Sequence, residues 1–209
     1  MRRRFKVIAL TLITIVAIVV TWRTVVRMYP LRFHDRHTHC IKQTGLGLRM
    51  YSGDHGGQFP NSANGYGDAL LLLAPYIGSN SLELLTGPGY DTRVFDEARS
   101  NNHDVAEQEC GRVYVQGLSE SNAPDIVILF DRLATHGADH GPLWGQLGRE
   151  MLFVDGHMEF VAESNWSSIV TAQVARLVEA GLSAETAKWY YAQEPKHVVQ
   201  GWRALFSGP

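Results

Sequence analysis

An apolar run without charge extends from Val7 to Val20, directly after basic residues at positions 2–4 and 6. A helix needs about 20 mainly apolar residues to cross a bilayer, with roughly 17 as the lower limit. Counted from Phe5 to Trp22, an aromatic residue suited to the membrane interface, the run is long enough. The pattern predicts a cytoplasmic basic segment (1–6) and a transmembrane anchor (7–26). The anchor side chains are Val7, Ile8, Leu10, Leu12, Ile13, Ile15, Val16, Ile18, Val19, Val20 and Trp22.

The charges around the run indicate its orientation. The basic cluster before it predicts a cytoplasmic N-terminus and an exported remainder, although Arg23 and Arg27 after it weaken the asymmetry. A cleaved secretory signal is the alternative, but the residues at 21–24, TWRT, are a poor cleavage site. Under either interpretation most of the chain leaves the cytoplasm.

A second helix is predicted from Leu31 to Tyr51, continuing out of the membrane after a kink at Pro30. Gly45 and Gly47 weaken this helix unless another element packs closely on them. Its packing face consists of residues at three- and four-residue steps, namely Cys40, Ile41, Thr44, Leu48 and Tyr51.

The next part of the chain is rich in turn formers. Three glycines and a proline within residues 52–60 end the helix. A short helix is predicted over residues 68–76, ended by Pro75. Residues 77–109 contain few apolar positions and are interpreted as irregular surface.

The pattern then changes to short runs of strand formers, at residues 112–118, 125–130, 150–154 and 157–161. The last two flank Asp155-Gly156, a strong hairpin signal. Four strands without intervening helices predict an antiparallel meander, and therefore an α+β fold: a long N-terminal helix packed on a small antiparallel sheet.

Helical periodicity returns after residue 162. Asn165 is a suitable N-cap for a helix ending near Gly181, and Ser183 for a second helix extending to about Gln193. A third helix is predicted over residues 197–206. The helix that follows Asn165 has an apolar face, which consists of Trp166, Ile169, Val170, Val174, Leu177 and Val178. The sequence thus predicts an exported α+β domain (27–162) and a helical extension (163–209), which either covers the sheet or binds a partner.

Two motifs carry a resemblance to a known family. Residues 40–51, CIKQTGLGLRMY, lead into residues 54–60, DHGGQFP, and residues 151–160 read MLFVDGHMEF. The chain resembles pilin-like proteins related to type II secretion pseudopilins. In these a cysteine, a Lys-Gln-x-Gly-Leu helix and a tyrosine precede a Gly-Gly-x-Phe-Pro loop, and an Asp-Gly-His hairpin follows near the end. The similarity covers roughly residues 5–162.

The resemblance implies a structural or interaction subunit of a secretion- or pilus-like envelope assembly. It would be a single-pass protein of the bacterial inner membrane with a periplasmic domain. Its partners would be the lipid bilayer, other envelope proteins and possible copies of itself. The alternatives are a tethered module that binds a small ligand or metal, and an exported metal-dependent hydrolase. The first hypothesis predicts no enzymatic activity.

The chain also departs from the family. Arg4 precedes Phe5 where prepilin peptidase substrates usually carry glycine, and Ala9 occupies the place of a glutamate. The family often has Cys-Pro where this chain has Thr-Gly-Pro at 86–88, and His140 lies farther upstream of Asp155 than the usual histidine. These differences put processing and filament assembly in doubt, but not the fold.

Charge and cysteine content bear on the classes of partner and on the cross-links that the chain can form. The net charge is −2, and the exported part has no arginine-rich, aromatic stripe, so no nucleic-acid partner is predicted. Cys40 and Cys110 permit one disulfide in an oxidising compartment, or stay two free thiols.

One cluster suits zinc, because two imidazoles and a carboxylate can hold the ion with an open position. Its members are His136, Asp139, His140, Asp155 and His157. Gly137 and Gly141 disfavour a helix that would bring the first two histidines together, and Asp155 is explained more simply as a turn residue.

Two further clusters contain residue types that bind metals in proteins. The oxygen ligands Asp54, Asn61, Asn64 and Asp68 would suit calcium, but match no EF-hand spacing. His34, His37 and His39 are interpreted as a solvated surface group. No catalytic residue and no cofactor is predicted, with zinc and calcium as the metals these clusters would suit.

Overall fold

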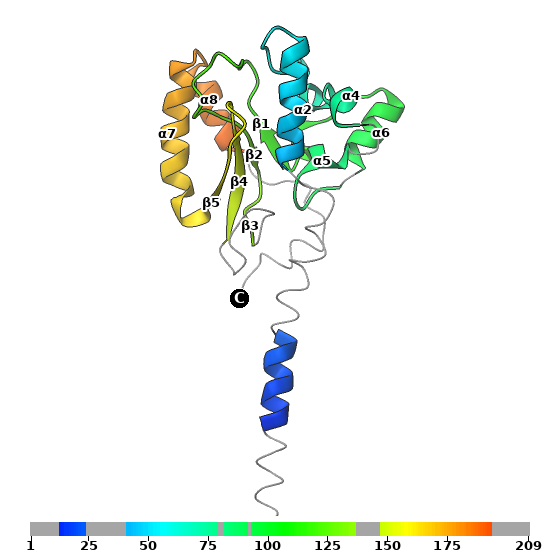
Figure 1. The fold of residues 1–209 in the computed structure, drawn as a ribbon, viewed down its shortest axis with the longest axis vertical. Coiled ribbons are helices and arrows are strands. Elements are labelled where there is room, and N and C mark those ends of the chain that lie inside the picture. Colours follow the sequence, from blue (N-terminus) through cyan, green and yellow to red (C-terminus); the bar gives the residue numbers. More distant parts are fainter. Residues whose placement is uncertain (1–12, 24–40, 79–81, 92, 137–146, 194–209) are drawn as a thin grey trace, which may run out of the picture. The chain divides into compact units, whose positions relative to one another are not determined.

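The computed structural model describes residues 13–23, 41–78, 82–91, 93–136 and 147–193. The chain divides into two compact units, residues 1–36 and residues 37–209. The second unit has an α+β fold, with helices before and after an antiparallel sheet (Figure 1). Its elements in chain order are α2 (Ile41–Asp54), α3 (Tyr66–Leu71), α4 (Ala74–Ile77), α5 (Glu83–Thr86), α6 (Val94–Asn101), η1 (Glu107–Glu109), β1 (Arg112–Tyr114), β2 (Val127–Asp131), β3 (Thr135–His136), β4 (Leu147–Phe153), β5 (Met158–Ala162), η2 (Glu163–Asn165), α7 (Trp166–Glu179) and α8 (Ala184–Tyr191).

In the first unit, residues 13–23 are helical and exposed on all sides. The large apolar side chains that lie more than half exposed are Ile13, Ile15, Val16, Ile18, Val19, Val20 and Trp22. Among the residues with a described placement, no helix combines the length and the apolar composition that a bilayer crossing requires. Both ends of the predicted anchor, 7–12 and 24–26, lie outside the described residues.

The sheet is the meander predicted from the sequence, with one additional short strand. β1 pairs with β2, β2 with β4, and β4 with β5, each antiparallel. Gly148 of β4 pairs with Thr135 of β3 on one edge and with Ala162 of β5 on the other. Leu152 of β4 likewise pairs with Leu129 of β2 on one edge and with Met158 of β5 on the other. β2 and β3 therefore lie along the same edge of β4, opposite β5.

The turn between β4 and β5 confirms the predicted hairpin. Gly156 has a φ of +88°, which its missing Cβ permits, and the backbone N–H of Phe153 donates to His157 O at 3.0 Å. Asp155 Oδ1 accepts the backbone N–H of His157 at 2.9 Å. Asp155 is therefore a turn residue, as predicted from the Asp-Gly pair.

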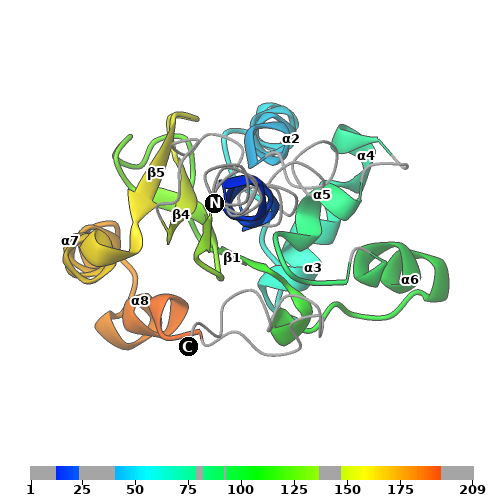
Figure 2. The ribbon, with the colours of Figure 1, turned by 90° about the horizontal axis from the view of Figure 1, so that it is seen from below.

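Helices cover both faces of the sheet (Figure 2). On one face, α2 lies over β4, and Ile41, Thr44 and Leu48 are buried as predicted. A Cβ on Gly45 would lie 2.9 Å from Cδ1 of Leu152, so the missing side chain lets this helix approach the sheet. The predicted residues 31–40, including Cys40, lie outside the described part of the chain.

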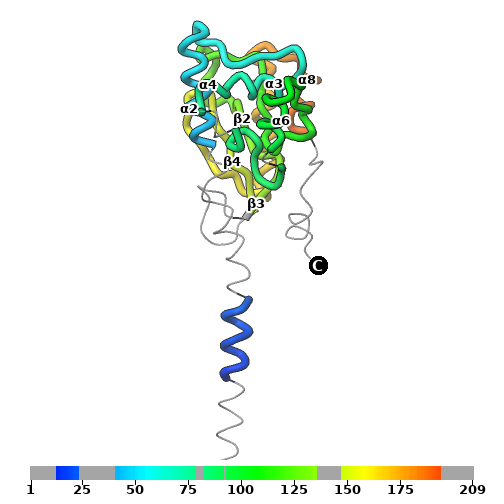
Figure 3. Tube along the Cα trace, turned by 90° about the vertical axis from the view of Figure 1, so that its right-hand side faces the viewer, coloured from blue at the N-terminus to red at the C-terminus, as the bar shows by residue number. Residues whose placement is uncertain are grey.

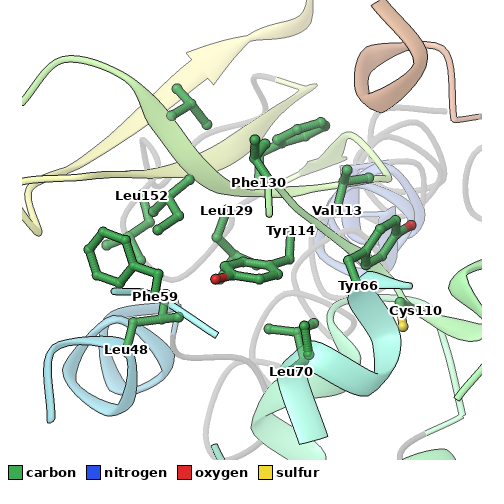
Figure 4. Packing of buried hydrophobic residues seen from close by; sticks show 14 of the residues in the cluster. Leu48, Phe59, Tyr66, Leu70, Cys110, Val113, Tyr114, Leu129, Phe130 and Leu152 are labelled. Atoms are coloured by element: carbon green, nitrogen blue, oxygen red, sulfur yellow. The ribbon is translucent and has the colours of Figure 1, made fainter. Parts of the chain in front are cut away.

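The core under α2 and α3 is continuous with the sheet (Figure 4). Leu48 and Leu70 approach it from the two helices, and Tyr114 lies between them. The hydroxyl of Tyr114 donates to Pro60 O at 2.7 Å, which satisfies a polar atom that is fully buried. Burial of apolar surface at about 25 cal/mol per Å² is the main stabilising contribution to this layer.

The interpretation of residues 77–109 as irregular surface is wrong. The segment contains α5 and α6, and its Leu82, Leu85, Phe95 and Val105 are buried in the core. α4 and α6 lie in front of the sheet on the α2 side (Figure 3). α5 and α6 are short and contribute three and two buried residues, respectively, so their periodicity is too brief to recognise from the sequence.

The helix predicted over residues 68–76 is two helices, α3 and α4. Pro75 does not end a helix but lies in the first turn of α4. Its missing backbone N–H costs nothing there, because the first N–H groups of a helix have no partner within it.

The C-terminal helices cover the opposite face of the sheet. Phe130 of β2 stacks on Tyr191 of α8 with ring centroids 4.8 Å apart, and Leu177 and Ala187 are fully buried in the same core. Ser183 caps α8 by accepting the backbone N–H of Thr186 at 3.0 Å, as predicted. The part of the extension that the structure describes, residues 163–193, therefore packs on its own domain. The helix predicted at 197–206 lies outside the described residues.

Candidate functional site

Three charged side chains form a buried row across the sheet. Arg112 of β1 is in register with Asp131 of β2, and the pairing of Phe130 with Met151 places Asp131 opposite Glu150 of β4. The three residues are 0%, 2% and 2% exposed, respectively. Arg112 Nε lies 3.3 Å from Asp131 Oδ1, and the backbone N–H of Glu150 donates to Asp131 Oδ2 at 3.3 Å.

Arg112 also joins the row to the helices above it. Its Nη1 donates to Thr44 Oγ1 of α2 at 3.1 Å and to the backbone O of Leu84 in α5. Thr44 Oγ1 in turn donates to Leu84 O at 3.2 Å. One guanidinium therefore connects β1, β2, α2 and α5.

The environment of Asp131 favours its neutral form. Burial raises its pKa and the guanidinium of Arg112 lowers it, while Glu150 raises it again, giving a pKa of about 7. The row can take up or release a proton near neutral pH. Since its members are closed off from solvent, it does not form an open substrate site.

A second polar cluster lies under α3. Arg132 Nη2 donates to the hydroxyl of Tyr66 and, at 2.7 Å, to Glu107 O. The backbone N–H of Tyr66 donates to Glu107 Oε1 at 3.3 Å. Burial raises the pKa of Glu107 and, to about 12, that of the Cys110 thiol. These contacts hold α3 and η1 together, and burial keeps the thiol protonated at neutral pH.

The two buried clusters were missed by sequence reasoning. Two of these residues stand at strand ends, since Arg112 opens β1 and Asp131 closes β2. A charged residue directly beside a near-continuous apolar run was a usable signal. Such a run indicates a strand whose two faces are both covered, so a charge at its end is expected to be buried as well. Nothing in the spacing indicated that Arg112, Asp131 and Glu150 share one register.

Of the zinc candidates, the structure brings together Asp155 and His157. His157 Nδ1 lies 2.5 Å from Asp155 Oδ1, and its ring stacks on Phe153 at 4.0 Å between centroids. Slight burial raises the pKa of Asp155, but the hydrogen bonds from His157 outweigh it and the pKa is lowered. His136 lies in β3 with its side chain outside the described atoms, and Asp139 and His140 lie outside the described residues.

The calcium candidates do not form one site. Asp54 Oδ2 accepts the hydroxyl of Tyr76 at 3.1 Å, whereas Asn64 Nδ2 donates to Asp68 Oδ2 at 3.0 Å. Asn61 is exposed in the loop before α3. Within the described ranges, no three acidic, histidine or cysteine side chains are placed to bind a metal. The histidines predicted at 34, 37 and 39 fall outside those ranges.

Cys110 is fully buried, with its Sγ 3.8 Å from Ala106 O. Because Cys40 lies outside the described residues, the disulfide between the two stays a prediction.

The outward face of α2 exposes two large apolar side chains. Leu46 and Met50, one helical turn apart, are 62% and 48% exposed. Beside them, Arg49 Nη1 lies 3.0 Å from Glu120 Oε1, which also accepts the hydroxyl of Ser52 at 2.8 Å. These contacts fix the loop before β2 against the end of α2, so the face is presented on a rigid element.

The chain matches no protein-family model, no curated protein and no solved structure.

Proposed function

We propose that the chain is a membrane-anchored, pilin-like subunit of a cell-envelope assembly, acting through protein–protein contacts rather than catalysis. The observation that carries the proposal is α2, which buries one face on an antiparallel sheet through Gly45 and exposes Leu46 and Met50 on the other. An exposed apolar pair on a rigid helix is suited to contact another protein.

The helix at residues 13–23 supports the anchor. Its apolar side chains are exposed around the whole helix, and a helix that is apolar on all sides is stable where lipid or protein covers it. We propose that this helix belongs to a single span over residues 7–26 of the bacterial inner membrane. The N-terminus would be cytoplasmic and the α+β domain periplasmic.

The anchor is tested by cell fractionation with protease protection. We expect the full chain to stay in the membrane pellet after a high-salt wash, and its α+β domain to be digested only from the periplasmic side. Recovery of the whole chain in the soluble fraction would refute the anchor.

The contact face is tested by placing a photo-crosslinking amino acid at Leu46 in native membranes and identifying the attached proteins. The double substitution Leu46→Lys with Met50→Lys should abolish co-purification of these neighbours. Leu72→Lys is the matched control, because Leu72 is also exposed (41%) but lies outside α2. Unchanged neighbours in the α2 variant would refute the proposed face.

A further inference from the structure

Asp131 lies where the sheet meets two of its covering helices. It closes β2 and is almost completely buried, with Arg112 on the neighbouring β1 and Glu150 on the neighbouring β4. Burying an ionised carboxylate is costly unless the surrounding charges favour it. Here one neighbour attracts the ionised form and the other repels it.

The same guanidinium that faces Asp131 also holds the helices. Arg112 Nε contacts Asp131, while Arg112 Nη1 donates to Thr44 Oγ1 of α2 and to Leu84 O of α5. The charge on Asp131 therefore acts directly on the group that connects α2 and α5 to the sheet. A change in the charge of Asp131 therefore reaches both helices through a single side chain, that of Arg112.

Among the residues that the structure describes, two charged side chains on the neighbouring strands act on Asp131. β1 provides the guanidinium of Arg112, which lowers its pKa, and β4 provides the carboxyl of Glu150, which raises it. α2 contributes the hydroxyl of Thr44 and α5 the backbone carbonyl of Leu84, both neutral. With burial as the largest contribution, the pKa of Asp131 is raised to about 7.

We propose that Asp131 is a proton-dependent latch between the sheet and the layer formed by α2 and α5. With a neutral Asp131, Arg112 keeps its contacts with Thr44 and Leu84. When the carboxyl releases its proton to water, the new charge is repelled by Glu150 and draws the guanidinium toward β2, which weakens those contacts. This inference goes beyond the proposed function and does not depend on it.

The sign of the pH dependence follows from linkage. The pKa of Asp131 is about 7 in the closed state and close to 3.8 once the site is exposed to water, so the closed state binds more protons between these values. The equilibrium constant for opening therefore rises with pH, by up to about tenfold per pH unit, and becomes constant above pH 7. The latch is closed in acid and loosened at neutral and alkaline pH.

Hydrogen exchange of the full chain in detergent micelles tests the latch. Rates are measured between pH 5 and pH 8.5 and corrected for the intrinsic effect of pH on each amide. We expect protection in α2 and α5 to fall by up to about tenfold per pH unit below pH 7 and then to stay constant. Protection in α7, on the opposite face of the sheet, should not change over the same range.

Substitutions separate the latch from other titrating groups. Asp131→Asn should make α2 protection independent of pH, whereas Asp155→Asn, at the exposed hairpin turn, should leave the wild-type profile. Glu150→Gln removes the repelling charge and should move the transition to lower pH. Constant α2 protection in the wild type, or a rise in exchange retained in Asp131→Asn, would overturn the proposal.

If Asp131→Asn does not fold, an NMR titration of the wild-type protein tests the latch instead. The side-chain carboxyl carbon of Asp131 is followed through a pH titration of the full chain. A midpoint near 7 supports the latch, and a midpoint below about 5 overturns it, since the carboxyl would then be ionised throughout the range in which α2 is proposed to loosen.

Discussion

Gly45 of α2 lies against Leu152 of β4 so closely that a Cβ atom on the glycine would be 2.9 Å from the leucine Cδ1. Because Leu152 is buried in the core, its side chain has little room to move away. We expect Gly45→Val to lower the free energy of unfolding by roughly 1–3 kcal/mol, the usual cost of overpacking. Urea unfolding of the full chain in detergent, followed by circular dichroism, measures this change.

Gly53 in the same helix is the matched control. A Cβ there would meet no atom within 4 Å. Gly53→Ala should therefore stabilise the protein by roughly 0.4–1 kcal/mol, because alanine restricts the unfolded chain without a clash. Equal effects of the two substitutions would contradict a close contact at Gly45.

Arg149 connects β4 with the start of the C-terminal helices. Its Nε and Nη2 each lie 3.0 Å from a carboxylate oxygen of Glu163, and its guanidinium carbon lies 4.5 Å from the centroid of the Trp166 ring. Arg149→Lys keeps the charge but loses the forked geometry and the stacking, so unfolding should become easier by about 1–3 kcal/mol. Thermal melting measures the loss.

An exposed pair provides the comparison for Arg149. Arg93 donates to both carboxylate oxygens of Asp91, at 3.1 Å and 2.7 Å, but its side chain is 73% exposed. Arg93→Lys should leave the melting temperature unchanged, because water competes for an exposed ion pair. A similar loss in both variants would show that burial of Arg149 is not the cause.

Tyr190 and Tyr191 are neighbours with opposite hydrogen-bonding situations. The hydroxyl of Tyr190 accepts the backbone N–H of Gln116 at 3.1 Å. The buried hydroxyl of Tyr191 has no hydrogen-bond partner among the residues that the structure describes. Tyr191→Phe should therefore stabilise the protein by about 1 kcal/mol and Tyr190→Phe should destabilise it by a similar amount. Denaturant melts of the two variants give the signs, and a reversed order would refute the assignment.

Burial should make Cys110 unreactive in the folded protein. Its pKa is raised to about 12, so very little thiolate is present at pH 8. With reductant present, we expect alkylation of Cys110 to be at least about a hundredfold slower in the native protein than in urea. Mass spectrometry of the peptide containing Cys110 measures this difference, and rapid native labelling would contradict the burial.

The same measurement without reductant examines the disulfide. If Cys110 is paired with Cys40, it will remain unlabelled even in urea. If it is a free thiol, it will be labelled as soon as the protein unfolds.

Four strands, β1, β2, β4 and β5, and their order could be predicted because each carried a local signal, whereas the two-residue β3 carried none. The run before Asp155-Gly156 and the alternation after it indicated β4 and β5, and the glycine confirmed the turn. The close packing required at Gly45 was also predictable, since a glycine inside a helix is costly without it.

The buried row could not be predicted in the same way. Arg112, Asp131 and Glu150 are far apart in sequence and meet only through strand register, which a local pattern does not specify. The short helices α5 and α6 were missed because a few apolar residues do not establish a helical period. In each case the decisive contact is long-range.

The packing of Tyr191 on Phe130 has a practical consequence for anyone who shortens this protein. A fragment that stops at Ala162 would retain the strands β1 to β5 but lose α7 and α8, so that Phe130 would no longer be covered by Tyr191. Such a product should aggregate rather than behave as a minimal domain. The helices after residue 162, which the sequence presents as an extension, thus cover one of the two faces of the sheet and keep its apolar side chains out of water.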